Sequence, residues 1–535
     1  MTDFEYTPIY SLFDFKNIEF DKISKDYISE VQAGNSKLLK IDAKALEAVS
    51  QKSFSMINYF FSKSHLQQLS NILKDKNSSE NDKFVAKKLI ENAVAASSGI
   101  FPLCQDTGTA SVIGEKGNLV LTDFDEKKAI SQGVYNTYTQ ENLRYSQLLP
   151  NSVFEEYNSK TNLPAQIDLY SGKGRSFKFL FVAKGGGSSN KTFFFTENKS
   201  VLNFEKLKKF LEENIKKIGT AACPPYHLGI VIGGTSPEMN LKTLKLLTAG
   251  ALDHIPHEKN NEYLALRDKE VENLADNICL NTGLGAQYGG RYFCLDSKVL
   301  RLPRHGASVF ISIGVSCYAH RNQFAFIDKT GIFLEKKEKE PSIYLPDEEI
   351  DFKSPVHINL DQPMEKIRKK LSELEVSVPV LLTGDIVVAR DIAHAEIMNK
   401  LEKENYMPDY LKNHPVYYAG PAKIPECCAS GSFGPTTSAR MDSYVHKFQE
   451  HGGSLVMIGK GNRTPVVKKA CSKFKGFYLG AIGGAAALVG KESVKKVEVI
   501  DYEELGMEAV HKIRVENFPA FLVTDDKGND FFDKS

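Results

Sequence analysis

The chain has 535 residues, of which 42% are hydrophobic and 25% are charged, as in an ordinary globular protein. This length exceeds what a single hydrophobic core usually holds, so we expect several domain-sized units. The net charge of +1 excludes a global field that would recruit nucleic acid or a membrane surface. We therefore expect neither as a partner.

The cysteine content and the N-terminal residues favour the cytoplasm. Eight cysteines in so long a chain do not make a disulfide framework and are typical of a reducing compartment. The first thirty residues carry seven acidic residues, three lysines and no arginine, which opposes a mitochondrial transit peptide. No apolar run reaches the roughly 18–20 residues of a membrane span. The longest candidate, 476–490, is rich in glycine and predicts a packed strand and turn.

The first two-thirds of the chain alternate amphipathic helices with glycine-rich loops. Residues 78–99 have a polar start suited to capping, followed by apolar positions at helical spacing and a glycine. The same pattern predicts a helix over 128–149, with Arg144 near its end, and a third over 203–219. The apolar run 227–234 predicts a buried strand.

A charged, proline-containing stretch without periodicity, 335–355, is the best candidate for a domain boundary. We assign residues 1–336 to an N-terminal domain, 337–361 to a linker and 362–535 to a C-terminal domain. Beyond the boundary, strands and helices alternate, which is typical of an α/β layer. The pattern predicts helices over 364–374, 391–404, 437–452 and 464–474, and strands over 377–389, 416–420, 454–459 and 477–483.

Three cysteines lie in loop-like segments beside polar partners: Cys104 in FPLCQDTGTA, Cys223 in GTAACPPYHLG and Cys317 in GVSCYAHR. A thiol in such a setting is placed to act as a thiolate ligand. The three lie about 120 and about 95 residues apart, which excludes a zinc knuckle, whose ligands come in close pairs. Three ligands are one fewer than a closed [4Fe–4S] cluster takes, so one iron would stay open as a Lewis acid. The residues alone leave a metal site and inert buried thiols about equally open.

The other cysteines are expected to be inert. Cys279, Cys294 and Cys471 lie in apolar or helical segments, where a cysteine usually behaves as a small hydrophobic residue. Cys427 and Cys428 are adjacent in the chain, and adjacent thiols rarely bind one metal well together. We therefore place none of these five side chains in the candidate metal site.

Nine motifs follow one another along the chain and carry a family resemblance. They are PLCQDTGT (102–109), NLRYSQ (142–147), NLPAQIDLY (162–170), AKGGGSSNKT (183–192), IGGTSPE (232–238), RLPRHGAS (301–308), RDIAHA (390–395), GPTTSARMDSYV (434–445) and GKGNR (459–463). In this order, and over nearly its full length, the sequence resembles the class I, iron–sulfur fumarate hydratases. Two departures are modest. The chain has GPTTSARMDSYV where GPTTAGRMDSYV is expected, and GVSCYAHR where Asp is more usual at position 320. Neither removes a thiolate or a charge that the chemistry uses.

The resemblance implies a two-lobed α/β chain, with a mixed α/β N-terminal cluster-binding domain and a smaller C-terminal α/β domain. It places the active site between the lobes and shares it across a homodimer. It implies a hydro-lyase that reversibly hydrates fumarate to L-malate with a [4Fe–4S] cluster on Cys104, Cys223 and Cys317. The open iron of that cluster would bind the substrate hydroxyl and carboxylate.

Two alternatives to this function remain. One is a related hydratase of another dicarboxylate, such as tartrate or mesaconate. Full-length collinearity favours fumarate, because tartrate dehydratases commonly divide the two lobes between separate chains. The other is a non-catalytic metal- or nucleic-acid-binding protein. The near-neutral charge and a set of arginines and lysines suited to a dicarboxylate oppose it.

The same motifs imply the residues that bind substrate and move protons. The positions expected to bind the dianion are Gln105, Arg144, Gly187, Asn190, Lys191, Arg390, Thr437, Arg440 and Lys460. Thr436 would take the C3 proton, with Arg440 and a helix N-terminus behind residues 434–437 stabilising its alkoxide, because a threonine hydroxyl is a poor base. Asp106 would act as the acid toward the hydroxyl, supported by His305. A purely structural role is the alternative for His305.

Overall fold

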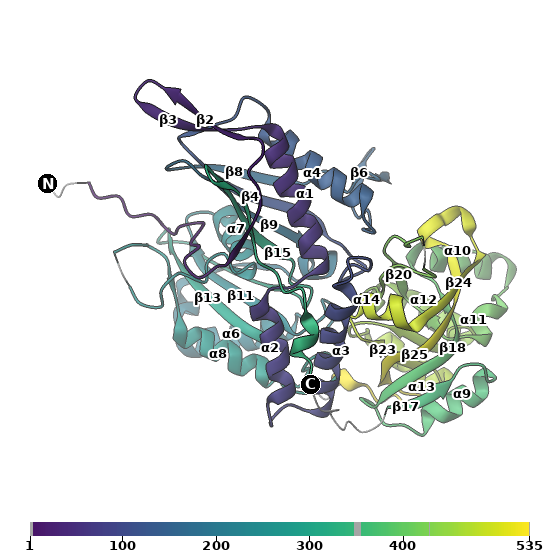
Figure 1. The fold of residues 1–535 in the computed structure, drawn as a ribbon. Coiled ribbons are helices and arrows are strands. Elements are labelled where there is room, and N and C mark those ends of the chain that lie inside the picture. Colours follow the sequence, from purple (N-terminus) through teal and green to yellow (C-terminus); the bar gives the residue numbers. More distant parts are fainter. Residues whose placement is uncertain (1–3, 260, 347–354, 427, 534–535) are drawn as a thin grey trace.

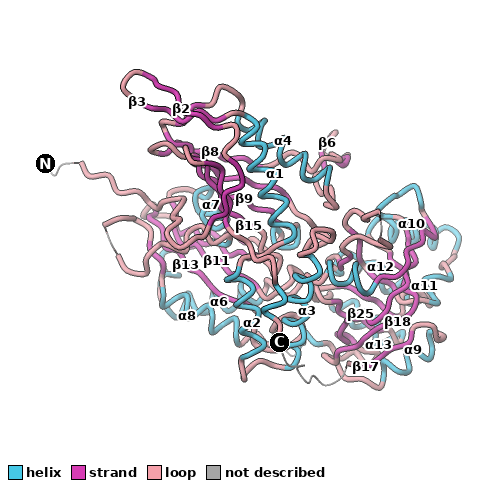
Figure 2. The backbone as a smooth tube through the Cα atoms, in the orientation of Figure 1, coloured by secondary structure: helices cyan, strands magenta, loops and turns pink. Residues whose placement is uncertain are grey.

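The structure is a computed structural model that describes residues 4–259, 261–346, 355–426 and 428–533. A larger N-terminal part, purple to teal, lies beside a smaller C-terminal part, green to yellow (Figure 1). Helices and strands alternate along both parts, so the predicted α/β class is confirmed (Figure 2). No helix in the described ranges is long and apolar enough to cross a membrane.

Two sheets organise the N-terminal part. The first has the order β1-β16-β15-β9-β4-β8, and the second has the order β10-β14-β11-β13-β12. The strands of the first are β1 (Phe20–Ser24), β16 (Gly331–Glu335), β15 (Asn322–Asp328), β9 (Phe177–Lys184), β4 (Thr109–Gly117) and β8 (Gln166–Gly172). Those of the second are β10 (Phe193–Glu197), β14 (Val309–Ser316), β11 (Tyr226–Gly234), β13 (Cys294–Arg304) and β12 (Leu266–Arg267). All nine residues of β11 are buried, which confirms the strand predicted over 227–234.

Helices cover these sheets. They are α1 (Ala43–Tyr59), α2 (Lys63–Lys74), α3 (Glu80–Ala96), α4 (Glu126–Gln140), α5 (Gly186–Ser189), α6 (Phe204–Lys216), α7 (Pro237–Thr248) and α8 (Lys269–Leu280). Small strands lie at the margin, with β2 (Ile28–Ala33), β3 (Ser36–Ile41) and β5 (Val120–Leu121) in one sheet and β6 (Leu148–Pro150) pairing with β7 (Glu156–Asn158). The helix predicted over 78–99 is confirmed as α3, and a capping box of Ser79 and Asp82 starts it. The helix predicted over 203–219 is confirmed as α6, which begins after Asn203.

The helix predicted over 128–149 is shorter than expected. It is α4, which ends at Gln140, so Arg144 lies beyond the helix and not near its end. The backbone of Arg144 bonds elsewhere, because its N–H donates to Thr107 Oγ1 and its carbonyl accepts from the same hydroxyl, both at 3.0 Å. Contacts with the Cys104 loop therefore replace further helical turns.

The C-terminal part is built on a seven-stranded sheet of order β17-β18-β19-β22-β23-β25-β24. Its strands are β17 (Val356–Asn359), β18 (Pro379–Val388), β19 (Val416–Tyr417), β22 (Val456–Gly459), β23 (Phe477–Ala481), β25 (Val510–Thr524) and β24 (Val494–Asp501). Because β18 also pairs with β25, five of the strands close into a ring. The predicted alternation is confirmed by α9 (Met364–Ser372), α10 (Asp391–Glu404) and α13 (Pro465–Phe474) around these strands.

Two C-terminal predictions need correction in detail. The strand expected over 416–420 is divided between β19 and β20 (Ala419–Pro421), and β20 pairs with β21 (Phe433–Pro435) outside the main sheet. The helix expected over 437–452 is a 3-10 turn, Ser438–Met441, followed by α12 (Asp442–Glu450). The glycine-rich run 476–490 forms β23, a turn and the short helix α14 (Ala486–Leu488), which ends the run in a helix and not only a turn.

The two parts share one hydrophobic core. Phe84 on α3 packs edge to face on Phe521 of β25, with ring centroids 5.8 Å apart. The Tyr288 hydroxyl donates to the carbonyl of Ala481 at 2.6 Å. Lys423 of the C-terminal part donates to carbonyls at the end of α4, those of Tyr138, Thr139 and Glu141. A site between the two parts would therefore lie at a packed, hydrogen-bonded junction.

The domain limits stay predictions. Part of the linker assigned to 337–361, namely 347–354, lies outside the described residues. The described residues before that gap include a short 3-10 turn, Pro341–Tyr344, whose first residue is buried. The Tyr344 and Leu345 side chains pack against the shared core. The first residues of the assigned linker therefore pack against the shared hydrophobic core.

Gly133 marks the crossing of α4 and α1. A Cβ at this position would lie 2.5 Å from the carbonyl oxygen of Glu47, 2.6 Å from Ser50 Cβ and 2.8 Å from the nitrogen of Gln51. Two of these atoms belong to the backbone of α1 and cannot turn away. The helices approach closely because position 133 has no side chain.

Overpacking a core costs about 1–3 kcal/mol, and a clash with two backbone atoms belongs to the upper part of that range, so replacing Gly133 with Ala should lower the free energy of unfolding by a net amount of about 1–2 kcal/mol. The net amount allows for the roughly 1 kcal/mol that alanine gains over glycine in helix propensity. Urea unfolding measures the change. The matched control is Gln132→Ala, at the exposed neighbouring position, which should stay within about 0.5 kcal/mol of the original protein. Equal stability of the two variants would contradict the close crossing.

Candidate functional site

Cys104, Cys223 and Cys317 converge on one buried region from three separate loops. The N–H of Tyr318 donates to the carbonyl of Cys223 at 3.1 Å, which joins two of the loops directly. Burial raises the pKa of Cys104 to about 12, Arg321 opposes the rise, and the charges of Cys223 and Cys317 add to it. Burial also raises the pKa of Cys223, and the charge of Cys317 contributes. Each thiol thus lies within electrostatic reach of the others.

Helices α1 and α3 fix the Cys104 loop. The N–H of Leu103 donates to the carbonyl of Asn58 at 2.8 Å, and the amide of Asn92 donates to the carbonyl of Leu103 at 3.0 Å. The side chain of Asn92 also accepts from the N–H of Leu488 at 3.0 Å. One buried asparagine therefore ties the loop to both parts of the molecule.

A glutamine joins the Cys223 loop to the C-terminal part. The amide of Gln287 donates to the carbonyls of Pro224 (3.0 Å) and Gly483 (2.7 Å) and accepts from the N–H of Gly483 at 2.7 Å. A Cβ on Gly483 would lie 2.4 Å from Cys223 Sγ, so only glycine leaves room for the thiol here. Cys223 itself has a φ of +65°, a left-handed conformation that tertiary contacts must maintain.

The three thiols are not arranged around a single metal ion. Among the described residues, no three His, Cys, Asp or Glu side chains lie close enough together to hold one ion. Thiolate ligands of an iron–sulfur cluster bind different irons, so they surround a space and do not meet at a point.

Lys460 Nζ lies 3.2 Å from Cys223 Sγ. Burial lowers the pKa of Lys460, but the attraction of all three thiolates outweighs it, so the pKa is raised.

The remaining cysteines described lie elsewhere. Cys279 and Cys294 are buried together in the core, with their sulfur atoms 3.0 Å apart. Cys471 is buried on α13, where Gln449 approaches its sulfur at 3.9 Å. Cys428 is half-buried, and Cys427 lies outside the described residues. The packing of Cys279, Cys294 and Cys471 matches the hydrophobic role expected of them.

Gln105 and Asp106 connect the Cys104 loop to two other loops of the site. The amide of Gln105, a residue 6% exposed, donates to the carbonyl of Pro435 at 3.1 Å. The carboxylate of Asp106 accepts from the N–H of Gly108 at 3.1 Å and from the N–H of Gly186 at 2.8 Å. Both residues therefore have fixed orientations beside the thiols.

The predicted substrate-binding residues of the glycine-rich loop 185–191 lie in different surroundings. A Cβ on Gly187 would lie 3.6 Å from the carbonyl oxygen of Ala221 and 3.8 Å from Lys460 Nζ, so Gly187 lies beside the Cys223 loop. Asn190 is exposed. The ammonium of Lys191 donates to the carbonyl of Lys217 at the end of α6, at 3.2 Å. The structure thus brings Gly187 to the Cys223 loop, while the side chain of Asn190 is open to solvent and that of Lys191 reaches the end of α6.

Three predicted arginines, one from the N-terminal part and two from the C-terminal part, lie within electrostatic reach of one another. Burial lowers the pKa of Arg390 to about 10, Glu508 opposes this fall, and the charges of Arg144 and Arg440 deepen it. Arg390 forms an ion pair with Glu508, and Arg440 pairs with Asp391 at 3.2 Å. Three cations held this close would bind a dianion strongly.

Thr436 lies against one of these arginines. The guanidinium of Arg440 donates to Thr436 Oγ1, and the N–H of Thr436 donates to the carbonyl of Tyr418 at 2.8 Å. Thr437 forms a backbone bridge with Lys460. Because α12 begins only at Asp442, the expected helix start lies one 3-10 turn beyond these threonines.

Ser438, a departure from the expected motif, has a structural role. Its hydroxyl accepts from the N–H of Lys460 at 2.9 Å and lies 3.1 Å from the hydroxyl of Tyr478. The serine therefore fixes the backbone of the lysine that contacts Cys223.

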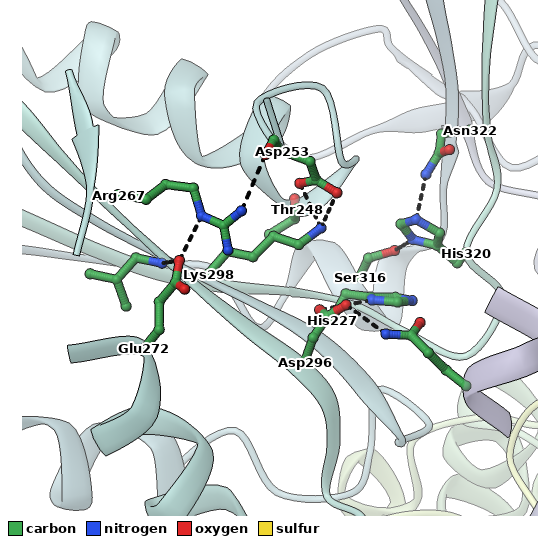
Figure 3. A network of polar contacts seen from close by, with 12 residues as sticks. His227, Thr248, Asp253, Arg267, Glu272, Asp296, Lys298, Ser316, His320 and Asn322 are labelled. Atoms are coloured by element: carbon green, nitrogen blue, oxygen red, sulfur yellow. Dashed lines mark hydrogen bonds and ion pairs between the residues drawn. The ribbon is translucent and has the colours of Figure 1, made fainter. Parts of the chain in front are cut away.

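His320, the second departure, braces the Cys317 loop (Figure 3). Its Nδ1 lies 2.7 Å from the hydroxyl of Ser316, and its Nε2 lies 2.8 Å from the amide nitrogen of Asn322. Its ring lies against that of His227, with centroids 4.2 Å apart, and His227 Nδ1 is 2.9 Å from Asp296 Oδ1. The residue before Cys317 is thus anchored by a partly buried polar network.

His305 is not brought to Asp106 within this chain. It lies exposed on the turn between β13 and β14, where its Nδ1 accepts from the N–H of Ala307 at 3.2 Å. A tight, polar turn of the sequence RHGAS accounts for this position.

Three charged residues near the site were missed by the sequence reasoning: Lys184, Arg321 and Glu508. Lys184 directly precedes the glycine run of AKGGGSSNKT, and Arg321 ends GVSCYAHR. Their positions in these motifs could have predicted that they lie beside the thiols. Burial lowers the pKa of Lys184 to about 8, with the charge of Cys317 opposing. Glu508 has no motif, and only the fold brings it to Arg390.

Comparison with known proteins extends over both parts of the chain. A family model described as "Fumarate hydratase (Fumerase)" matches residues 47–325, and one described as "Fumarase C-terminus" matches residues 331–535. "Fumarate hydratase 1, mitochondrial" of Leishmania major is 49% identical, covering 100% of this chain and 98% of the relative. "Fumarate hydratase class I, aerobic" of Escherichia coli (strain K12) is 48% identical, covering 96% of this chain and 94% of the relative. "Fumarate hydratase 2" of Leishmania major is 46% identical over 100% of this chain and 95% of the relative. The chain therefore belongs to the class I fumarate hydratase family.

Proposed function

We propose that the protein interconverts fumarate and L-malate, using a [4Fe–4S] cluster held by Cys104, Cys223 and Cys317. The observation that carries this proposal is the meeting of three thiols, that of Cys223 buried and those of Cys104 and Cys317 half-buried, with a cluster of arginines around Thr436. The names of the full-length relatives support fumarate as the substrate. When bound, such a cluster supplies an iron without a protein ligand that acts as a Lewis acid toward oxygen.

The cations around the site would bind the substrate dianion. Arg144, Arg390, Arg440 and Lys460 supply the positive charge, and guanidinium groups suit bidentate contact with carboxylates. Arg144 Nε is buried without a hydrogen-bond partner among the described residues, so a substrate oxygen would satisfy it. Gln105, Gly187 and Thr437 line the same region from the two lobes. Asn190 and Lys191, on the same glycine-rich loop as Gly187, complete the proposed substrate-binding residues.

Thr436 and Asp106 would move the protons. The bond from Arg440 to Thr436 Oγ1 favours the alkoxide that a threonine base must form. Each oxygen of Asp106 accepts one backbone N–H and keeps a second lone pair, so the carboxyl group can still exchange a proton while its position is fixed.

His305 would act across a dimer. The family resemblance implies an active site shared between two copies, and an exposed histidine at a turn can approach the Asp106 of a second copy. The homodimer and the cytoplasmic location are parts of this proposal.

A dicarboxylate other than fumarate is the alternative. The cation cluster recognises two carboxylates without distinguishing tartrate or mesaconate. Both lobes in one chain and a shared core favour the fumarate enzymes, whose named members match over the full length.

Replacing Cys104, Cys223 or Cys317 with Ser should abolish bound iron, because each thiolate would hold one iron of the cluster. Anaerobically reconstituted protein should hold about four irons per chain before the change. Iron assay and absorption spectra measure this. The matched control is Cys471→Ser, a buried thiol away from the site, which should retain its iron. Complete iron loss in Cys471→Ser with the fold intact would contradict the assignment.

Replacing Thr436 with Ala should stop exchange of the C3 proton of L-malate with deuterated solvent and reduce kcat by about 10²–10⁴-fold. Iron content and substrate binding should persist. The control is Asp106→Asn, which should also turn over slowly but keep measurable exchange, since Asp106 would act on the C–O bond. Exchange at the original rate in Thr436→Ala would leave this threonine as a carboxylate binder only.

Replacing Glu508 with Gln should lower KM for L-malate by about two- to tenfold, equivalent to up to about 1.4 kcal/mol. Glu508 is an anion beside Arg390, so it competes with a substrate carboxylate for that guanidinium. Glu504→Gln, at an exposed position of the same 3-10 segment, is the control and should leave KM unchanged. A raised KM in Glu508→Gln would show that the carboxylate mainly holds Arg390 in place.

A further inference from the structure

A buried ion pair joins the two segments that carry Lys460 and Arg440. The guanidinium of Arg463, the last residue of the GKGNR motif, donates to the carboxylate of Asp442 at 2.5 Å. The two side chains are only 1% and 7% exposed. The same carboxylate accepts from the N–H of Thr464 at 2.7 Å. Because Asp442 begins α12 directly after the 3-10 turn of Arg440, the pair ties this turn to the loop of Lys460.

Two tyrosine rings pack against the guanidinium of Arg463. Its central carbon lies 5.3 Å from the ring centre of Tyr418 and 4.8 Å from that of Tyr478. Both tyrosines are at most 1% exposed. Contact with aromatic faces stabilises a cation that burial has removed from water. A carboxylate and two rings therefore fix the position of this guanidinium.

Tyr418 connects Arg463 to the proposed base. The N–H of Tyr418 donates to the carbonyl of Ile458 in β22 at 2.9 Å, and its carbonyl accepts from the N–H of Thr436 at 2.8 Å. The hydroxyl of Thr436 accepts from the guanidinium of Arg440. The backbone of the proposed base is therefore fixed by the same tyrosine whose ring packs against Arg463.

Tyr478 connects Arg463 to Lys460. Its hydroxyl donates to the carbonyl of Gly461 at 2.9 Å and lies 3.1 Å from Ser438 Oγ. Ser438 bonds Lys460 twice, because its hydroxyl accepts from the N–H of Lys460 at 2.9 Å and its N–H donates to the carbonyl of Lys460 at 3.1 Å. The backbone of Lys460 is therefore bonded through both of its polar groups.

Filling this space does not require an ion pair. Removal of two charges from water is costly, and apolar side chains of similar volume often stabilise a protein as well or better. Apolar side chains do not supply orientation, however. A guanidinium donates only in its own plane, and a carboxylate only accepts. The pair between Arg463 and Asp442 therefore selects one arrangement of the two segments that it joins.

We propose that Arg463, together with Asp442, is a positioning residue for the reaction proposed above. It acts through Lys460, Arg440 and Thr436, and not by contact with the substrate. The inference rests on the proposed function, in which the two cations bind the dianion and Thr436 moves a proton. Without the pair, these side chains no longer meet the substrate together, so its affinity and the rate of proton transfer both fall.

Steady-state kinetics of the anaerobically reconstituted holoenzyme test the proposal. The double variant Arg463→Met, Asp442→Asn removes both charges, so no unpaired charge stays buried. We expect KM for L-malate to rise by about tenfold, equivalent to about 1.4 kcal/mol. Exchange of the C3 proton per bound cluster should slow by about 10²-fold, the cost of a misplacement of about 1 Å. A pair that only stabilised the fold would lower the yield of enzyme and leave KM unchanged.

A second ion pair of the same part supplies the matched control. Arg514 on β25 donates to the carboxylate of Asp361 at 2.7 Å, and its side chain is 38% exposed. The double variant Arg514→Met, Asp361→Asn removes the same two kinds of charge away from the site. Its KM and its rate of C3 exchange per cluster should equal those of the original protein. An equal rise of KM in both double variants would overturn the proposal.

Binding of succinate separates this inference from the proposed function. Succinate is a dicarboxylate dianion without a hydroxyl to lose, and calorimetry of the holoenzyme measures its affinity. We expect the double variant of Arg463 and Asp442 to bind it about tenfold more weakly. If the original protein binds succinate but does not hydrate fumarate, this loss still supports the positioning role, and the proposed substrate is wrong. Unchanged succinate affinity and KM in the variant would overturn the inference.

Two milder variants decide the question if the double variant does not fold. Tyr478→Phe and Ser438→Ala each remove one hydroxyl from the contacts between Arg463 and Lys460. Each should raise KM by about two- to tenfold, the effect of one hydrogen bond. Their combined effect should be smaller than the product of the two, because both act on the same backbone. An unchanged KM in both single variants would overturn the proposal.

Discussion

The arrangement of this molecule depends on charge balance around three thiols that are buried or half-buried. Thiolates close together repel one another, and burial removes the water that would screen them. The chain meets this cost with cations on both sides, Lys460 against Cys223 and Arg321 within reach of Cys104. Buried cations of this kind are stable only beside fixed anions. Attraction between the thiolates and the cations therefore fixes both sets of side chains, and with them the loops that carry them.

Both lobes are required for this balance. The three cysteines belong to the N-terminal part, whereas Lys460 and the arginines 390 and 440 belong to the C-terminal part. Gln287 and Asn92 span the junction with hydrogen bonds to Gly483 and Leu488. The shared core beneath them resists sliding of one lobe on the other, so packing holds the two sides of the site together.

The local sequence pattern predicted the helices and strands well. It predicted the contacts between segments distant in sequence less well. Helices such as α3 and α10 have caps or periodicity within their own residues, so their limits could be predicted to within a few residues. The end of α4 could not, because it is set by Thr107, which is distant in sequence and bonds the backbone of Arg144. Closure of the C-terminal strands into a ring also depends on pairing of β18 with β25, which no local pattern encodes. The thiol loops carried a signal because their residue types are unusual. Glu508 carried none, since a single glutamate in a charged segment looks like any exposed acid.

The bonds that Gln287 and Lys460 make across the junction also set an order of events during synthesis. All three thiols are in the chain by residue 317, yet Lys460 and Gly483 emerge from the ribosome much later. Until then the Cys223 loop lacks the contacts that hold its left-handed backbone, and Cys223 lacks its cation. The nascent N-terminal lobe therefore carries its three thiols in an unfinished pocket, and completion of the pocket waits for nearly the whole chain.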